Sequence, residues 1–436
     1  MSELPDDPVS PGRRAALGNM AWLLGDKAFA LVVGLAIHGL IARTLGPVGS
    51  GHFAYASAIL QAGLGLSLVC AGVALLPRFC RMNGALPGAI ANVFALRVVA
   101  SVVAMLVMMG FCVLMVDDPQ RRMISLILLL AVPLIEPFYV IATYWLSRNH
   151  NRPTVIARTS GLTVRALIVV LGIVWGAPVW VLAAAWVVES AINASLQTLQ
   201  ARQAFPGRRL VRFVRPSRMR QYLSFGLRFV LALWLAQLFL RIDRLVLANW
   251  LTPAEFGIYA APMQLVEVWT QVAYLIGSSI ATAYLYKKLR DREVVRAFLT
   301  TAGAMAGVGL LGLIGAWLLG PVLLRVVFGP AFEASYPFLL AGAAFAVLLF
   351  ADQAVDMLIM GLNLPRLLAI KWGVALAVSF SVFWWGFPRL GAYVGPVGMA
   401  CGVVSAWIVL SLLPPRWRGG SGPQADSRDV SEIAPT

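Results

Sequence analysis

The sequence predicts an all-α polytopic membrane protein of about twelve transmembrane helices, arranged as two six-helix lobes around a central cavity. Composition, the number of apolar windows and a basic segment at mid-chain predict this class. Of the 436 residues, 60% are hydrophobic and 12% are charged, whereas a soluble domain is about 45–50% apolar and about 25% charged. A span needs about 20 residues, so roughly a dozen spans leave no length for a large soluble domain.

Twelve apolar windows, each bounded by turn residues or charges, are candidate spans. They cover residues 16–42, 53–77, 92–116, 123–147, 156–176, 178–204, 221–248, 257–286, 297–320, 336–361, 367–387 and 396–414.

The connections between these windows alternate in charge. One side carries about 20 Lys and Arg residues and the other about 6, and the more basic side of a bilayer protein is cytoplasmic. The poorer side holds Arg43, Arg121, Arg122, Arg244, Arg325 and Arg389. We therefore expect both termini in the cytoplasm, and an uncleaved first span.

The most basic connection, residues 205–220 with the sequence FPGRRLVRFVRPSRMR, falls at mid-chain. It is typical of an amphipathic cytoplasmic linker on anionic lipid. The formal net charge of +16 fits such basic loops, so we expect no nucleic acid partner. The predicted organisation is an N-terminal tail 1–15, a first lobe 16–204, this linker, a second lobe 221–414 and a disordered tail 415–436.

The two halves share an internal repeat. The stretch Ala42–Ala54 (ARTLGPVGSGHFA) matches Ala248–Ala260 (ANWLTPAEFGIYA), so that Pro47 pairs with Pro253 and Gly51 with Gly257. Both stretches form the outer turn after the first span of a half. Duplicated halves of parallel topology are typical of transporters, with the substrate path between the halves.

Several short motifs then point to a family. They include Ile41-Ala42-Arg43-Thr44-Leu45-Gly46-Pro47, Leu76-Pro77-Arg78, Arg241-Ile242-Asp243-Arg244, Phe256-Gly257-Ile258-Tyr259 and Val327-Phe328-Gly329. With these motifs the chain, from about residue 16 to 414, resembles the polysaccharide-transporter (O-antigen flippase-like) family of the multidrug/oligosaccharidyl-lipid/polysaccharide exporter superfamily.

The resemblance implies two six-helix lobes, alternating access, and export of a polyprenyl-diphosphate-linked oligosaccharide for surface polysaccharide biosynthesis. It implies a bacterial inner-membrane location, with polysaccharide assembly proteins among the expected partners, and no enzymatic activity. A cation or drug antiporter of the same superfamily is the alternative. Four cysteines without a CxxC spacing and three histidines predict neither a metal site nor a cofactor.

Polar side chains recur within the apolar windows, where an ionisable group costs at least about 2.5–3.5 kcal/mol. In the eighth window Gln264, Glu267, Gln271 and Tyr274 follow a 3-4-3 spacing and share one helix face. We expect them, with Glu136 in the fourth window, to line the cavity. The alternative for such groups is hydrogen bonding between helices.

Cations in the first and seventh windows are candidates for binding an anionic headgroup. Lys27 lies beside Asp26, and Arg228 enters the seventh window from the same side of the membrane. Asp26 either pairs with Lys27 or has a partner of its own, and Arg228 binds the headgroup or reaches the lipid surface. Arg241, with Asp243 near the outer end of that window, forms a gate or an interface anchor.

Acidic residues are candidates for ion coupling. Asp352 and Asp356 lie one helical turn apart, and two neighbouring carboxylates favour a shared proton. The alternative is an ion pair with a Lys or Arg of another span. Glu267 is a third candidate for protonation. No GxxxxGK[ST] motif is present, which points to an ion gradient, the membrane potential or product removal as the energy source.

Overall fold

A computed structural model describes residues 13–70, 72–82, 86–206, 210–280, 293–362 and 364–413. Every regular element in these ranges is a helix. The predicted tail 415–436 lies outside the described residues, as does most of the tail 1–15.

The first half of the chain forms eight helices. They are α1 (Arg13–Leu66), α2 (Gly72–Arg81), α3 (Leu86–Met115), α4 (Pro119–Leu129), α5 (Val132–Ile135), α6 (Tyr139–Ser147), α7 (Arg152–Val174) and α8 (Val179–Ala204).

The second half repeats this plan after a short helix in the linker. Its elements are η1 (Leu210–Phe213), α9 (Pro216–Phe239), α10 (Ile242–Trp250), α11 (Pro253–Ile280), α13 (Val294–Val327), η3 (Pro330–Ser335), α14 (Tyr336–Gly361), α15 (Pro365–Leu390), η4 (Gly391–Tyr393) and α16 (Val394–Leu412).

These elements confirm the predicted fold class. Within the described residues, eight stretches are long and apolar enough to cross a membrane. The stretch Gly25–Leu66 overlaps the first two predicted windows, and Pro365–Leu412 overlaps the last two. The seventh and eighth windows correspond to α9 with α10 and to α11. The chain is therefore a multi-pass helical membrane protein.

Three of the predicted spans are interrupted where continuous helices were expected. The second breaks between α1 and α2, the fourth between α4, α5 and α6, and the seventh between α9 and α10. Pro133 and Pro137 explain the breaks in the fourth span, since proline removes a backbone N–H from the helix ladder. Backbone freed inside a membrane needs polar partners, and the breaks prove to be where buried charges gather.

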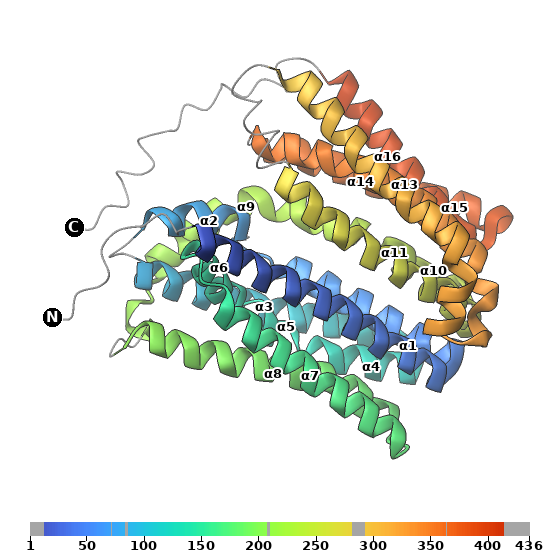
Figure 1. The fold of residues 1–436 in the computed structure, drawn as a ribbon, viewed down its shortest axis with the longest axis horizontal. Helices are drawn as coiled ribbons and strands as arrows, with labels where there is room; N and C mark the ends of the chain where they lie inside the picture. Colours follow the sequence, from blue (N-terminus) through green and yellow to red (C-terminus); the bar gives the residue numbers. More distant parts are fainter. Residues whose placement is uncertain are drawn as a thin grey trace.

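The helices pack as two lobes, α1–α8 and α9–α16. Neighbouring pairs are α7 with α8 and α1 with α7 in the first lobe, and α13 with α14 and α15 with α16 in the second. Helix α1 also packs along α11 across the two lobes. Figure 1 shows α1 beginning at the left of the bundle and α16 ending at its top, whereas the α1 kink and α10 lie at the right.

We call the end of the bundle that contains the α1 kink the Arg43 end, because Arg43 lies three residues before Gly46, at which α1 kinks. There Gly46 has a backbone φ of 66° and is followed by Pro47 inside the helix. A positive φ is readily adopted only by glycine, and Pro47 cannot donate a backbone hydrogen bond. These two residues fold α1 back on itself and create the first turn of the repeat.

Candidate functional site

The two repeated turns contact each other directly. A Cβ atom on Gly257 would collide with the carbonyl of Pro47, and a Cβ on Gly51 would lie 3.0 Å from the carbonyl oxygen of Pro253. Gly51 pairs with Gly257 in the repeat and Pro47 with Pro253. The contact is therefore reciprocal, as expected of two halves related by a two-fold axis. It joins the lobes at the Arg43 end.

One ionic cluster lies in the first lobe. The Arg165 guanidinium of α7 is 2.6 Å from the Glu189 carboxylate of α8 and lies over the Trp186 ring at 4.5 Å. About two turns earlier on α7, Arg158 forms an ion pair with Asp26 of α1. The side chain of Arg158 is 35% exposed, whereas that of Asp26 is 1% exposed. Helix α7 thus presents two arginines, of which Arg158 remains accessible.

A second ionic cluster lies at the break of the seventh span. Arg241 precedes α10 and Arg244 is in its first turn, and both bind the Glu267 carboxylate of α11, at 2.5 and 2.9 Å. The Glu267 side chain keeps 25% exposure. Neighbouring Asp243 instead accepts a 2.7 Å hydrogen bond from the Tyr259 hydroxyl. Arg241 and Arg244 thus lie together, whereas their pairing with Glu267 of α11 was not expected from the sequence.

His38 of α1 contacts the first cluster through Trp186. Its ring contacts Trp186 edge-on, with the centroids 5.8 Å apart. Helix α1 packs along α11, which carries Glu267 of the second cluster, so both clusters adjoin the pair of helices that joins the lobes. Four arginines and four carboxylates contribute to the two clusters, and Lys27 adds a further positive charge on α1.

Lys27 is half-buried, and no ion pair involves it among the described residues. The open choice for Asp26 is thereby settled, because its partner is Arg158 rather than Lys27. On α11, Gln264 is half-buried and Gln271 is exposed. The side chains of Arg228 and Tyr274 lie outside the described residues. The roles predicted for all these residues stay predictions.

Glu136 does not line a cavity, contrary to the expectation. It is 3% exposed, and its carboxylate is 3.2 Å from the guanidinium of Arg97 on α3. Arg97 also donates to the backbone carbonyls of Val69, Cys70 and Glu136, at 3.0, 2.7 and 3.0 Å. One buried arginine thus supplies donors to carbonyls freed at two helix breaks, and Glu136 balances its charge.

Asp352 and Asp356 share a lysine. The Lys371 ammonium of α15 lies 2.6 Å from Asp352 and 2.5 Å from Asp356, and Trp407 of α16 donates to Asp352 at 2.7 Å. The cluster is enclosed by α14, α15 and α16, and the Lys371 side chain is 0% exposed. Of the two arrangements that the sequence left open, the ion pair with another span is the one observed.

The sequence reasoning missed the cations that partner these acids. They are Arg97, Arg158, Arg165 and Lys371. Each interrupts an apolar window with a positive charge, which is itself a signal because such residues are costly in a membrane. Their partners are on other helices, 24 or more residues away for Arg97, Arg158 and Arg165, so local spacing contains no information about the pairing.

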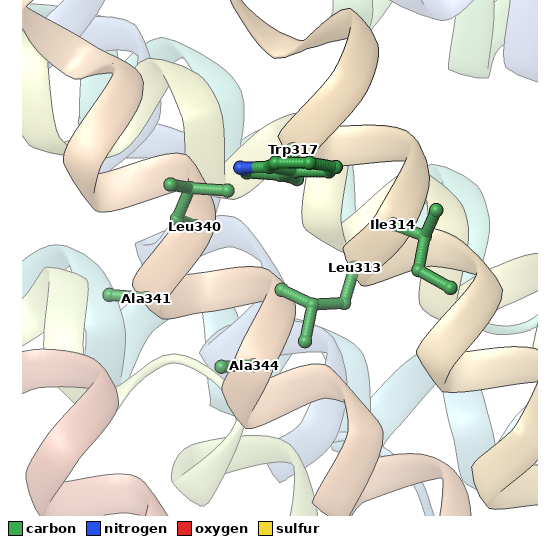
Figure 2. Close-up of a pocket in the computed structure, with 6 residues that line it drawn as sticks. All are labelled: Leu313, Ile314, Trp317, Leu340, Ala341 and Ala344. Atoms are coloured by element: carbon green, nitrogen blue, oxygen red, sulfur yellow. The ribbon is translucent and has the colours of Figure 1, made fainter.

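A surface groove on the second lobe differs in chemistry from these ionic clusters. Figure 2 shows Leu313, Ile314 and Trp317 of α13 beside Leu340, Ala341 and Ala344 of α14. Every lining side chain is apolar. The groove contains none of the charged residues described above, so it does not contribute to the candidate site.

Comparison with known proteins agrees with the family that the motifs indicated. A family model described as "Polysaccharide biosynthesis protein" matches residues 89–281, which run from α3 to the end of α11. The resemblance to the polysaccharide-transporter family is confirmed. Among curated proteins, no significant match is found.

The chain is similar in fold to two kinds of exporter whose structures have been solved. The lipid II flippase MurJ in an inward closed conformation has a TM-score of 0.70 at 10% identity, over 91% of this chain and 89% of that chain. An inward-facing multidrug resistance MATE transporter has a TM-score of 0.64 at 14% identity, over 96% and 100%. A transporter of the same superfamily from Pyrococcus furiosus gives 0.59 at 15%, over 91% and 93%.

Proposed function

We propose that this protein moves a polyprenyl-diphosphate-linked oligosaccharide from the cytoplasmic to the outer leaflet of a bacterial inner membrane, by alternating access of its two lobes. The family match and the shared exporter fold support a transporter. The choice of substrate depends on Lys27, because it is half-buried on α1 and forms no ion pair with a carboxylate among the described residues.

The charge pattern suits an anionic headgroup. Lys27 and the partly exposed Arg158 lie on the first lobe and Arg241 on the second, and we include Arg228 in the same headgroup site. A diphosphate carries about two negative charges, and each is worth about 2.3 kcal/mol across 100 mV. Outward movement is favoured by the inside-negative potential, so the protein has to lower the barrier rather than supply the energy.

The contact between the lobes at the Arg43 end decides from which side of the membrane the substrate enters in this proposal. The Arg43 end belongs to the charge-poor side and is therefore assigned to the outside. Because the repeated turns contact each other there, the conformation is closed outside, and the headgroup enters from the cytoplasm. The glycan passes between the lobes while the lipid chain stays in the bilayer. Basic cytoplasmic loops bind anionic lipid, and assembly proteins receive the product.

The acidic residues are assigned to gating or ion coupling. Protonation of Glu267 would release Arg241 and Arg244, and protonation of Asp352 or Asp356 would loosen Lys371. Asp26 and Asp243 hold Arg158 and Tyr259 in the same way. A drug antiporter would need carboxylates free for an organic cation. Within the described residues, however, Asp26, Glu189 and Glu267 each bind an arginine.

Deletion of the gene, followed by complementation, tests the proposal. We expect the deletion strain to accumulate carrier-linked glycan on the cytoplasmic leaflet. Wild type and Lys27→Arg should relieve the accumulation, whereas Lys27→Gln at equal protein level should not. Absence of glycolipid accumulation, with increased sensitivity to cationic drugs, would contradict the proposal and favour the antiporter.

A further inference from the structure

Two arginines at the Arg43 end bridge the lobes in the same manner. Arg43 of α1 donates to the carbonyls of Arg325 and Val327, both at 3.1 Å, and also to that of Val326. These three carbonyls are the last of α13. The Arg325 carbonyl also accepts from the backbone N–H of Gly329 at 3.1 Å, whereas Pro330, four residues after Val326, has no N–H to donate to the Val326 carbonyl. Arg43 thus caps the C-terminus of a helix of the opposite lobe, the position at which a cation also complements the helix dipole.

Arg121 provides the second bridge. It lies in the first turn of α4 and donates to the Ala248 carbonyl at 2.5 Å and to the Asn249 side chain at 3.3 Å. Both acceptors are in the last turn of α10, in the second lobe. The guanidinium is also held over the ring of Tyr55, 4.8 Å from its centroid. Again an arginine of the first lobe caps a helix C-terminus of the second.

The two bridges follow the internal repeat. In its alignment Arg43 corresponds to Asn249. Arg43 contacts the end of α13, just before the connection from α13 to α14 in the second lobe. Asn249 contacts Arg121, just after the equivalent connection from α3 to α4 in the first lobe. Together with the reciprocal contact of Gly51 and Gly257, the bridges form one closure, which we call the outer latch.

The acceptors in the outer latch are neutral. Among the described residues neither Arg43 nor Arg121 forms an ion pair with a carboxylate, unlike Arg158, Arg165, Arg241 and Arg244. When the lobes part at this end, both guanidiniums lose their carbonyl partners and present five donors each to whatever enters the gap. Phosphate oxygens can accept two parallel hydrogen bonds from one guanidinium. These charge-assisted bonds are stronger than the bonds that the same guanidinium makes to neutral carbonyls.

We propose that Arg43 and Arg121 form a second anion site at the outer end of the path, where diphosphate oxygens replace the backbone carbonyls and so favour the open latch. This inference rests on the proposed function for the identity of its natural ligand. It assigns to these residues the release of the headgroup, distinct from its capture at Lys27. An anion bound there lowers the free energy of the outward-open state only.

The test measures the latch with a reporter that needs no glycolipid. Ser50, 4% exposed, lies beside Gly51 in the closure. S50C is introduced into a variant with the four native cysteines changed to alanine, in right-side-out vesicles. Its labelling by a membrane-impermeant maleimide is followed with and without external inorganic pyrophosphate, and with sulfate at equal ionic strength as control.

Loss of both arginines in R43Q/R121Q should raise the labelling rate about tenfold or more, which corresponds to one charge-assisted hydrogen bond. Pyrophosphate, but not sulfate, should accelerate labelling of the S50C parent and have no effect in R43Q/R121Q. R43K/R121K should also label faster yet keep a response, because the charge remains without the fork. R325Q is the matched control, since its exposed side chain makes no latch contact, and should behave as the parent.

Unchanged labelling in R43Q/R121Q would overturn the latch, and equal effects of pyrophosphate and sulfate on the parent would overturn the anion site. Monodisperse elution of each variant shows that it is folded, and the single variants R43Q and R121Q, each with a reduced pyrophosphate response, replace R43Q/R121Q if the latter is not. Because no glycan is used, these results are separable from failure of the proposed function, which would leave the pyrophosphate response intact while glycolipid movement is absent.

Discussion

Replacing Arg97 with methionine should be among the most damaging changes available in this protein. Arg97 is 1% exposed and provides all the side-chain donors described for the Val69 and Cys70 carbonyls at the break between α1 and α2. Its loss leaves the Glu136 carboxylate buried without a partner, which costs about 3–5 kcal/mol. Each carbonyl left without a donor adds about 1–3 kcal/mol to the loss of folding free energy. The total loss is then comparable to the free energy of unfolding of many whole domains.

The assay is the amount of monodisperse protein that survives a graded heat step in detergent. We expect the order wild type, then E136M, then R97M/E136M, then R97M as the least stable. E136M is milder because Arg97 keeps three carbonyl acceptors, and the double variant removes the unpaired charge. S101A is the control on the same helix, since its buried hydroxyl bonds only to the carbonyl of Val98. The reasoning is refuted if R97M matches wild type, or if the double variant is less stable than R97M.

Two further predictions concern contacts within and between the lobes. Gly257→Val should prevent closure at the Arg43 end, because its side chain meets the Pro47 carbonyl, and a maleimide reporter there should label faster. Gly303→Val, with open space around it, should label as the parent, and equal labelling of both variants would contradict the prediction. Lys371→Met should lower heat resistance by leaving two carboxylates unpaired, and D352N should restore part of it. No improvement in the double variant would show that the ion pair is not the cause.

The sequence predicted the fold class and the repeat because these depend on composition and local pattern. Apolar windows indicate directly which segments lie in lipid. The pairing of Gly51 with Gly257 follows from the alignment of the two repeated stretches. The motif Arg241-Ile242-Asp243-Arg244 likewise marked a place where charges gather.

Partners could not be predicted in the same way. Whether Glu136 faces a cavity or an arginine depends on the rotation of α3 relative to the fourth span, which periodicity within one helix does not determine. The same holds for Asp352 and Asp356, whose neighbour Lys371 comes from the next helix. Helix breaks were also missed, because the broken segments remain apolar and only the prolines of the fourth span signal them.

Movement of a lipid-linked glycan by the purified protein tests the central claim most directly. Vesicles containing a fluorescent polyprenyl-diphosphate disaccharide are prepared with wild type, Lys27→Arg or Lys27→Gln, and the fraction of label that an external impermeant quencher reaches is followed over time. We predict that wild type and Lys27→Arg move the glycolipid and that Lys27→Gln, equally incorporated, does not. If wild type leaves the glycolipid in place but moves a cationic dye, the protein is an antiporter and the account is contradicted.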